Sequence, residues 1–283
     1  MKSFLIRSLC GTFLLLGLLF PVFSENQRIV HFSIDDAIIV FQNLTKNEEK
    51  YNSAFDEPLL NRLKKLHDKY GLKITMYVFY DYDGFCIVDC TEKFAPDFMR
   101  NSQWLKFAYH AYSGTVVFDN TGGGYCKTMK ALLKITGSPD CISDTARLHY
   151  YKGEKDEVSG YKALLTADSD SRPSYFLSTA QERELLESEK IFDAETAIHF
   201  YKTDFRLDNP FQFKRLFAQN KDEREIVFFT HEWLLQVRPR RNVILWAWAL
   251  IKRQMIFSHL EKVCAYAKKE NLKFAINAGD FYE

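Results

Sequence analysis

Hydrophobic and polar positions alternate along the chain in two patterns, one typical of strands and one typical of helices. Short runs rich in β-branched and aromatic residues predict strands, and stretches with apolar residues three and four positions apart predict helices. Residues 58–70 give the clearest helix, with four leucines on one face and Gly71 as the C-terminal cap. The pattern predicts strands at 28–34, 73–80, 105–109, 146–150, 161–166, 196–201, 225–230 and 272–276, and further helices at 125–135 and 243–269.

Strands and helices alternate throughout residues 25–283, and no Pro-, Gly- or Ser-rich linker divides them. Such an alternation is typical of a parallel sheet covered by helices, either closed as a barrel or open. We therefore expect a single α/β domain over residues 25–283. The stretch 180–222 has weak periodicity, and for it we predict helices and loops and assign no function.

The first 24 residues have the pattern of a secretory signal peptide. Lys2 and Arg7 precede an uncharged apolar run at 9–23, and Ser24 offers a small residue at the cleavage point. The alternative is an uncleaved membrane anchor, for which the run is slightly short. We expect an exported protein, periplasmic, cell-surface or secreted, with no later membrane span. Its oligomeric state is left open.

Charge and composition limit the classes of partner that the sequence supports. The 283 residues include 38 Lys and Arg against 37 Asp and Glu, a net charge of +1 that becomes −1 once the two basic residues of the signal are removed. A nearly neutral chain gives no electrostatic case for nucleic-acid binding. Its 25 Phe and 15 Tyr fit either a core or a sugar-binding cleft. Of its cysteines, Cys86 with Cys90 and Cys126 with Cys141 are the local disulfides we expect if any form.

Polar residues gather where the predicted strands end. Because the carboxyl ends of parallel strands meet at one edge of the sheet, such residues converge on one site. They are Asp35 and Asp36, His110, Arg147 and His149, Asp168 and Asp170, and His231 and Glu232. No G-x-G-x-x-G motif or P-loop follows the first strand, so a nucleotide site is not expected.

These residue types suit metal-assisted hydrolysis. Aspartate and histidine with an open position suit zinc or a similar divalent ion, which polarises a carbonyl and activates water. A second carboxylate can take the proton of that water, an arginine can orient this carboxylate, and a histidine can protonate the leaving group.

Five blocks of the sequence resemble the polysaccharide deacetylase superfamily, the NodB-homology fold. Residues 31–37 (HFSIDDA) resemble its T-F-D-D-G block, and 70–79 (YGLKITMYVF) resemble its G-x-x-A-T-F-F-V strand. Residues 104–114 (WLKFAYHAYSG) resemble the H-[ST]-x-x-H block, 147–151 (RLHYY) the R-x-P-Y-G block, and 228–231 (FFTH) the L-x-L-H end. The blocks follow the order of the family.

The resemblance implies a distorted (β/α) barrel with about seven parallel strands that hydrolyses an N- or O-acetyl group on a carbohydrate. Residue by residue, it implies that Asp35 is the general base and Asp36 a metal ligand. It further implies that His110 is the first histidine ligand, that Arg147 pairs with the base, and that His231 is the general acid.

One ligand of that pattern is missing, because Gly114 occupies the position of the second histidine. We favour His149 as the replacement, since a strand through 146–150 would place it on the same face as Arg147. Asp168, Asp170 or Glu232 are alternatives, and loss of the metal is another. The residues expected at the substrate are Asp168, Asp170, Glu232, Trp233 and Tyr112.

Two other functions remain open. One is a non-catalytic carbohydrate-binding or cell-envelope protein on the same fold. The other is a glycoside hydrolase with two carboxylates, Asp35 and either Asp168 or Asp170.

Overall fold

The computed structural model describes residues 27–119, 123–167, 174–239 and 241–281. The expected signal peptide, Asp168 and Asp170 lie outside these residues. Within the described part of the chain, no helix is long and apolar enough to cross a bilayer.

The main sheet has six strands, and all of its ladders are parallel. Their order is β10-β11-β1-β2-β5, and β12 also pairs with β1. The strands are β1 (Ile29–Ala37), β2 (Ile74–Phe79), β5 (Leu105–Ala111), β10 (Phe205–Arg206), β11 (Glu225–His231) and β12 (Lys273–Ala275). The α/β class with a mainly parallel sheet is therefore confirmed.

A second sheet has the order β6-β7-β9-β8, in which only β8 is antiparallel to its neighbour. Its strands are β6 (Thr145–Ala146), β7 (Ala163–Leu165), β8 (Lys190–Asp193) and β9 (Ile198–Tyr201). A short antiparallel hairpin, β3 (Asp81–Tyr82) with β4 (Phe85–Cys86), stands apart from both sheets.

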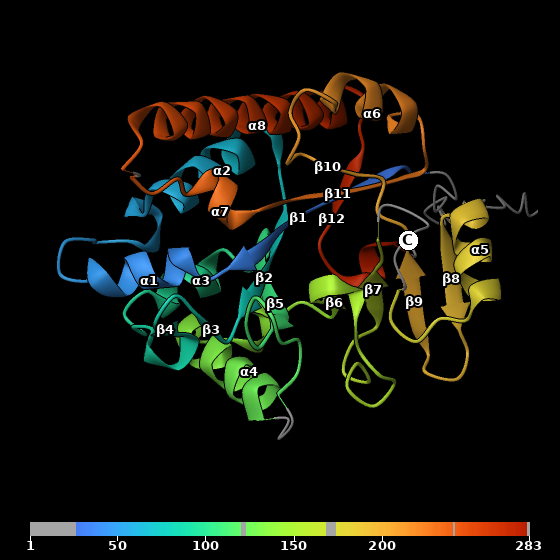
Figure 1. Cartoon of the computed structure of the whole chain (residues 1–283), viewed down its shortest axis with the longest axis horizontal. Helices are drawn as coiled ribbons and strands as arrows, with labels where there is room; N and C mark the ends of the chain where they lie inside the picture. The colour runs from blue at the N-terminus through green and yellow to red at the C-terminus, as the bar shows by residue number, and fades with distance from the viewer. Residues whose placement is uncertain (1–26, 120–122, 168–173, 240, 282–283) are drawn as a thin grey trace, which may run out of the picture.

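In Figure 1 the strands of the second sheet lie beside those of the main sheet. A parallel bridge between Phe107 of β5 and Ile142 leads from the main sheet to β6. At the other side the chain runs from β9 into β10, where the Asp204 amide donates to the Val227 carbonyl. The described residues thus form two sheets in barrel order, without a continuous closed ladder.

The helices are α1 (Ile39–Lys46), α2 (Pro58–Tyr70), α3 (Ala95–Arg100), α4 (Gly123–Thr136), α5 (Thr179–Ser188), α6 (Phe213–Asn220), α7 (Glu232–Leu235) and α8 (Val243–Lys269). Short 3-10 turns are η1 (Ala54–Asp56), η2 (Ile87–Asp89), η3 (Pro139–Cys141), η4 (His149–Tyr151) and η5 (Ala278–Phe281). In Figure 1, α2 and α8 lie on one side of the main sheet, and α3 and α4 lie on the other.

Burial explains why these elements form. Every residue of β2 is buried, so both faces of this strand are covered by other parts of the chain. The four leucines of α2 are buried as their spacing predicts, and Gly71 ends the helix at φ +76°, a conformation that glycine adopts without strain. The long helix α8 has the predicted bounds, and only its C-terminal half packs into the core.

The predicted strand at 146–150 is wrong over most of its length. Strand β6 ends at Ala146, and η4 follows at His149–Tyr151. Tyr150 and Tyr151 have φ of +57° and +55°, a left-handed conformation that breaks a strand and is costly for aromatic residues. The face-sharing argument for His149 therefore does not hold, although its side chain does reach the site.

The expected local disulfides are absent from the described residues, whose five cysteines are all free. Cys90 is buried with its Sγ 3.8 Å from the Phe41 carbonyl oxygen, whereas Cys86 is on the hairpin strand β4. Cys141 is buried against the Thr136 carbonyl, and Cys126 is exposed on α4. The two partners of each pair thus lie in different surroundings.

Candidate active site

A bulge in β1 turns two adjacent aspartates into the same site. Ser33 and Ile34 pair with Thr75 and Met76 of β2, but the next pair is Ala37 with Val78, so β1 contains one extra residue. Asp36 lies at the bulge with φ +59°, which aspartate tolerates better than most residues. Bulges of this kind often redirect side chains beside active sites. Without it, Asp35 and Asp36 would point to opposite faces of the strand.

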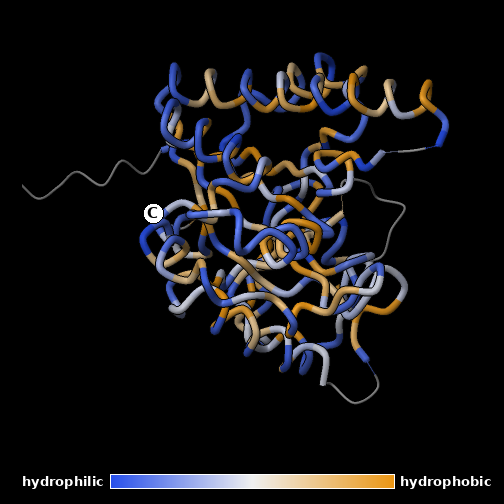
Figure 2. The backbone as a smooth tube through the Cα atoms, turned by 90° about the vertical axis from the view of Figure 1, so that its left-hand side faces the viewer, coloured by the Kyte–Doolittle hydropathy of each residue, from blue (hydrophilic) through white to orange (hydrophobic). Residues whose placement is uncertain are grey.

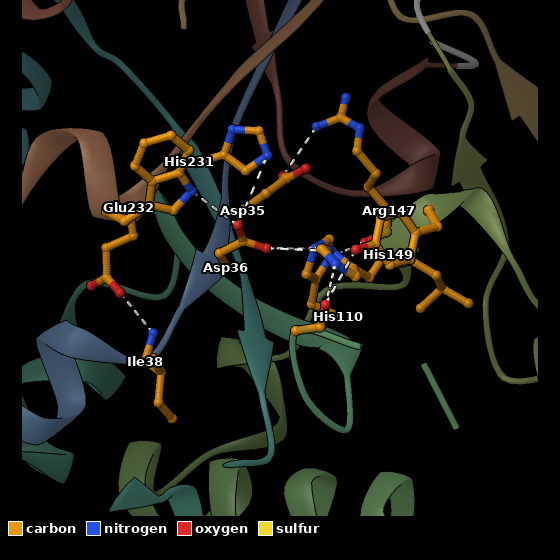
Figure 3. Close-up of polar contacts among 12 residues, drawn as sticks. Asp35, Asp36, Ile38, His110, Arg147, His149, His231 and Glu232 are labelled. Atoms are coloured by element: carbon orange, nitrogen blue, oxygen red, sulfur yellow. Dashed lines mark hydrogen bonds and ion pairs between the residues drawn. The ribbon is translucent and has the colours of Figure 1, made fainter. Parts of the chain in front are cut away.

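Asp36, His110 and His149 bring three ligand atoms together (Figure 3). Oδ1 of Asp36 lies 3.1 Å from Nε2 of His110 and 3.4 Å from Nδ1 of His149, and the two ring nitrogens are 3.1 Å apart. A tetrahedral zinc ion with ligand bonds of about 2.0–2.1 Å separates its ligands by about 3.3–3.4 Å. The spacing of the three atoms is close to this value.

The other nitrogen of each ring faces a backbone carbonyl. Nδ1 of His110 is 2.5 Å from the Arg147 oxygen, and Nε2 of His149 is 3.2 Å from the Gly114 oxygen. A carbonyl can only accept, so these nitrogens carry the protons, and in a neutral ring the other nitrogen presents a lone pair. Histidine ligands of metal ions are commonly oriented in this way.

Three acceptor atoms without a donor between them need a positive charge to balance them. The buried Oδ1 of Asp36 has no hydrogen-bond partner of good geometry. An ionised carboxylate facing two imidazole lone pairs fits a divalent cation in charge and in ligand type.

Asp35 forms a buried ion pair on the other side of the bulge. Nη1 of Arg147 lies 3.2 Å from Oδ1 of Asp35 and 2.6 Å from the Ser33 hydroxyl, while Nη2 donates to the Thr203 hydroxyl at 3.1 Å. The guanidinium also lies 4.0 Å above the ring of Phe229. These contacts fix Arg147, and Arg147 in turn orients the carboxylate.

His231, at the end of β11, is paired with a residue that the sequence analysis missed. Its Nδ1 donates to Oδ2 of Asp208 at 2.7 Å, and Oδ1 of Asp208 accepts from the Thr230 hydroxyl at 3.1 Å. Burial disfavours the charged ring, but the hydrogen bond and charge of Asp208, with the charges of Asp36 and Asp35, raise the pKa of His231 to about 9. Asp208 follows the short strand β10, inside the 180–222 stretch for which no role was predicted.

A cavity of about 80 Å³ is lined by Asp35, His231 and the two histidines of the three-ligand cluster. Its size suits a small substrate group rather than a whole sugar ring. Its lining comprises Asp35, His110, Arg147, Leu148, His149, Tyr150, Tyr151, Arg206, Phe229 and His231.

Of the residues expected at the substrate, Trp233 lies beside the site and Tyr112 does not line the cavity. Trp233 is 46% exposed beside the site, and its Nε1 donates to Oδ2 of Asp36 at 3.2 Å. Tyr112 stacks on Tyr80 and does not line the cavity, so its predicted role has no support.

The prediction for Glu232 needs correction. Its side chain is fully buried and points away from the cavity, and its two oxygens accept from the amides of Ile38, Ile39 and Val40 at 2.6–2.7 Å (Figure 3). A carboxylate at the start of α1 satisfies amides that have no partner inside the helix. Glu232 is therefore a structural residue that joins α7 to α1.

Neither a protein-family model nor a curated protein matches the sequence. Solved structures do, and deacetylases are among them. A peptidoglycan N-acetylglucosamine deacetylase is 12% identical over 91% of this chain and 89% of its own, with a TM-score of 0.45. A family 4 acetyl xylan esterase from Clostridium thermocellum, in complex with a cobalt ion, is 11% identical over 90% of each chain, with a TM-score of 0.44.

A third similar structure, Puue allantoinase, is 11% identical over 92% of this chain and 90% of its own, with a TM-score of 0.47. Its name differs in substrate from the other two at a comparable similarity. At such identities and TM-scores the matches describe a likeness in overall shape, and the function has to be inferred from the atoms of the site itself.

Proposed function

We propose that this chain is an exported, metal-dependent hydrolase that removes acetyl groups from a carbohydrate. The observation that carries the proposal is the convergence of Asp36, His110 and His149 on one point, next to a separate carboxylate and a separate histidine. The sequence blocks, which resemble polysaccharide deacetylases, suggest the acetylated carbohydrate and the export.

Asp36, His110 and His149 would hold a divalent ion, zinc being the best match to the ligands. When bound, that ion supplies Lewis-acid polarisation of the acetyl carbonyl and activation of the attacking water. His149 replaces the histidine missing at position 114. It is the first residue of η4, directly before the left-handed turn at Tyr150 and Tyr151.

Asp35 is the base in this proposal. Its carboxylate lines the cavity, is held by Arg147, and can accept the proton of the attacking water. Arg147 is a positioning residue because it acts through Asp35. Its buried charge also compensates the charge of the Asp35 carboxylate.

His231 is the acid. Its Nδ1 is committed to Asp208, so Nε2 faces the cavity, 3.9 Å from Oδ2 of Asp36. A ring held in the protonated form can donate this proton to the departing sugar oxygen or nitrogen. Asp208 thus positions His231 and favours its protonated form.

Acetate release from acetylated glycans tests the proposal. We expect release by the purified chain, its loss with a chelator, and its return with added zinc or cobalt. Asp35→Asn and His231→Gln should each lower kcat at least about a hundredfold while leaving metal content unchanged. Carbohydrate binding without acetate release would instead show a non-catalytic protein, and cleavage of glycosidic bonds would show a glycoside hydrolase.

A further inference from the structure

A second cavity, of about 390 Å³, lies among the helices on the α2 and α8 side of the main sheet (Figure 1). Residues of α1, α2 and α8 line it, together with the end of α7 and residues 236–239. Figure 2 shows α8 at the outer edge of the molecule, with both hydrophilic and hydrophobic turns along it. This cavity shares no described lining residue with the candidate active site. Its volume is typical of small-molecule sites.

Arginines from three separate segments line this cavity, which we call the arginine cavity. Arg62 comes from α2, Arg238 from the segment after α7, and Arg253 from α8. Arg253 and Phe257 are four positions apart, so they lie on one face of α8, the face that lines the cavity. No acid is among the described lining residues, so the walls carry an excess of positive charge.

Of the three arginines, only Arg238 has a carboxylate partner among the described residues. It forms an ion pair with Asp83 and also donates to the amide oxygen of Gln42 at 2.7 Å. The charge of Arg238 is therefore balanced inside the chain.

Arg62 is held by uncharged partners. Its Nη1 donates to the amide oxygen of Gln254 at 3.0 Å, and its guanidinium lies 3.7 Å from the centre of the Phe257 ring. The charge of Glu261 also acts on Arg62, but the carboxylate of Glu261 is paired with Lys69 at 2.9 Å. The positive charge of Arg62 thus has no carboxylate of its own.

Arg253 has the fewest contacts of the three. No hydrogen bond or ion pair joins it to any part of the chain that the structure describes, and its Nε is buried without a partner. A buried donor without an acceptor costs free energy. Burial and the charge of Arg253 lower the pKa of Arg62, so the two guanidinium groups are close enough to repel one another.

Two unbalanced guanidinium groups at one cavity match a ligand with two negative charges. A phosphate monoester carries a charge of about −1.5 to −2 at pH 7 and offers three acceptor oxygens. Guanidinium groups bind such oxygens through paired hydrogen bonds. Much of the remaining wall is apolar, because Leu59, Leu235 and Phe257 are buried side chains that line the same cavity. An apolar group on the ligand would contact them.

We propose that the arginine cavity binds a small phosphate monoester that carries an apolar group. The phosphate lies between Arg62 and Arg253, and the apolar group packs against Leu59, Leu235 and Phe257. A carboxylate ligand fits less well, because its single charge leaves one guanidinium unbalanced. The proposal does not depend on the hydrolase function, since the two cavities have no described lining residue in common.

Titration calorimetry of the full chain with phenyl phosphate, in a buffer free of phosphate, tests the proposal. We expect one site that binds phenyl phosphate about tenfold or more tightly than inorganic phosphate, because the ring leaves water. Benzoate, with one charge, should bind more weakly than phenyl phosphate, and phenol, which is neutral at pH 7, should not bind. Asp36→Ala should keep the binding, since phosphate bound at the candidate metal centre would be lost in that variant.

Substitutions of the arginines locate the site. Arg62→Gln with Arg253→Gln should weaken binding of phenyl phosphate about a hundredfold or more, by removal of two charged donors. The matched control is Arg183→Gln with Arg215→Gln, which removes the same charge from exposed positions on α5 and α6 and should change the affinity less than about threefold. Arg253→Gln alone removes no described hydrogen bond, so the folded protein tolerates it, and it should weaken binding about tenfold.

Failure of phenyl phosphate to bind would overturn the proposal. Binding that survives the loss of Arg62 and Arg253, or that disappears in Asp36→Ala, would also overturn it by placing the ligand elsewhere. Equal affinity for inorganic phosphate would overturn the role of the apolar wall, and binding of phenol would overturn the role of the charge.

Discussion

The carbonyl oxygen of Gly114 accepts a hydrogen bond from Nε2 of His149 at 3.2 Å. Position 114 is where the resembled sequence block has its second histidine, so the residue that lacks a ligand side chain holds the replacement ligand through its backbone. The backbone at the position without a ligand side chain thus orients His149, the proposed replacement ligand.

This relationship predicts that His149 matters for metal affinity and the side chain at 114 does not. We expect His149→Ala to weaken zinc or cobalt binding at least about a hundredfold, by removal of one of three protein ligands. Gly114→Ala is the matched control, because an added Cβ would meet only the Tyr82 ring at 3.7 Å and the carbonyl would remain. Titration calorimetry measures both, and equal affinity of the His149 variant would exclude it as a ligand.

Asp208→Asn should narrow the pH range of activity from the alkaline side. Asp208 helps to raise the pKa of His231 to about 9, and an acid catalyst works only while it is protonated. Activity is therefore retained below this pKa and lost as pH rises through it. Without Asp208 the pKa falls towards its usual value, so kcat/KM should decline at a pH lower by about one to two units. A pH–rate profile that does not move would show that His231 is not the acid.

Glu232→Ala should destabilise the fold rather than alter the chemistry directly. The substitution leaves three buried amides of the α1 N-terminus without their acceptor, at a cost of about 3 kcal/mol or more in free energy of unfolding. Chemical denaturation measures this cost. Exposed Glu270 is the control, and Glu270→Gln should change the free energy of unfolding by less than about 0.5 kcal/mol. A similar small effect at Glu232 would contradict the structural role.

His31 should make the protein less stable in acid. Burial and the charge of Arg147 lower the pKa of His31 to about 3, while in the unfolded chain it stays near its usual value of 6.5. Between these values the unfolded state binds more protons, so this contribution to stability is complete above pH 6.5 and is lost as pH falls towards 3.

Denaturant unfolding at several pH values between 4 and 7 checks this effect. In His31→Phe the slope of unfolding free energy against pH should be smaller by up to about 1.4 kcal/mol per pH unit. An unchanged slope would mean that His31 keeps an ordinary pKa in the folded protein.

The sequence predicted the parts of the fold that depend on local pattern. Helix α2 with its Gly71 cap and helix α8 have the predicted bounds, because leucine spacing and glycine conformation are local properties. The convergence of residues at strand ends also followed from the sequence, since parallel strands share an edge.

Other parts depend on tertiary contacts and could not be predicted in this way. The bulge at Asp36 appears only in the pairing of β1 with β2. Asp208 lies beside His231 because β10 pairs with β11. No sequence motif near position 208 predicts this pairing. Glu232 stands beside His231 in sequence, yet the turn into α7 directs it to the amides of α1 instead.

Metal content is the most direct test of the account. The purified chain, loaded with zinc or cobalt and then desalted, should retain about one ion per molecule, and Asp36→Ala and His110→Ala should retain almost none while still folded by circular dichroism. Asp208→Asn, which alters the neighbouring His231 pair and none of the three ligands, should retain the ion. Equal and negligible metal in all four proteins would contradict the proposed centre at Asp36, His110 and His149.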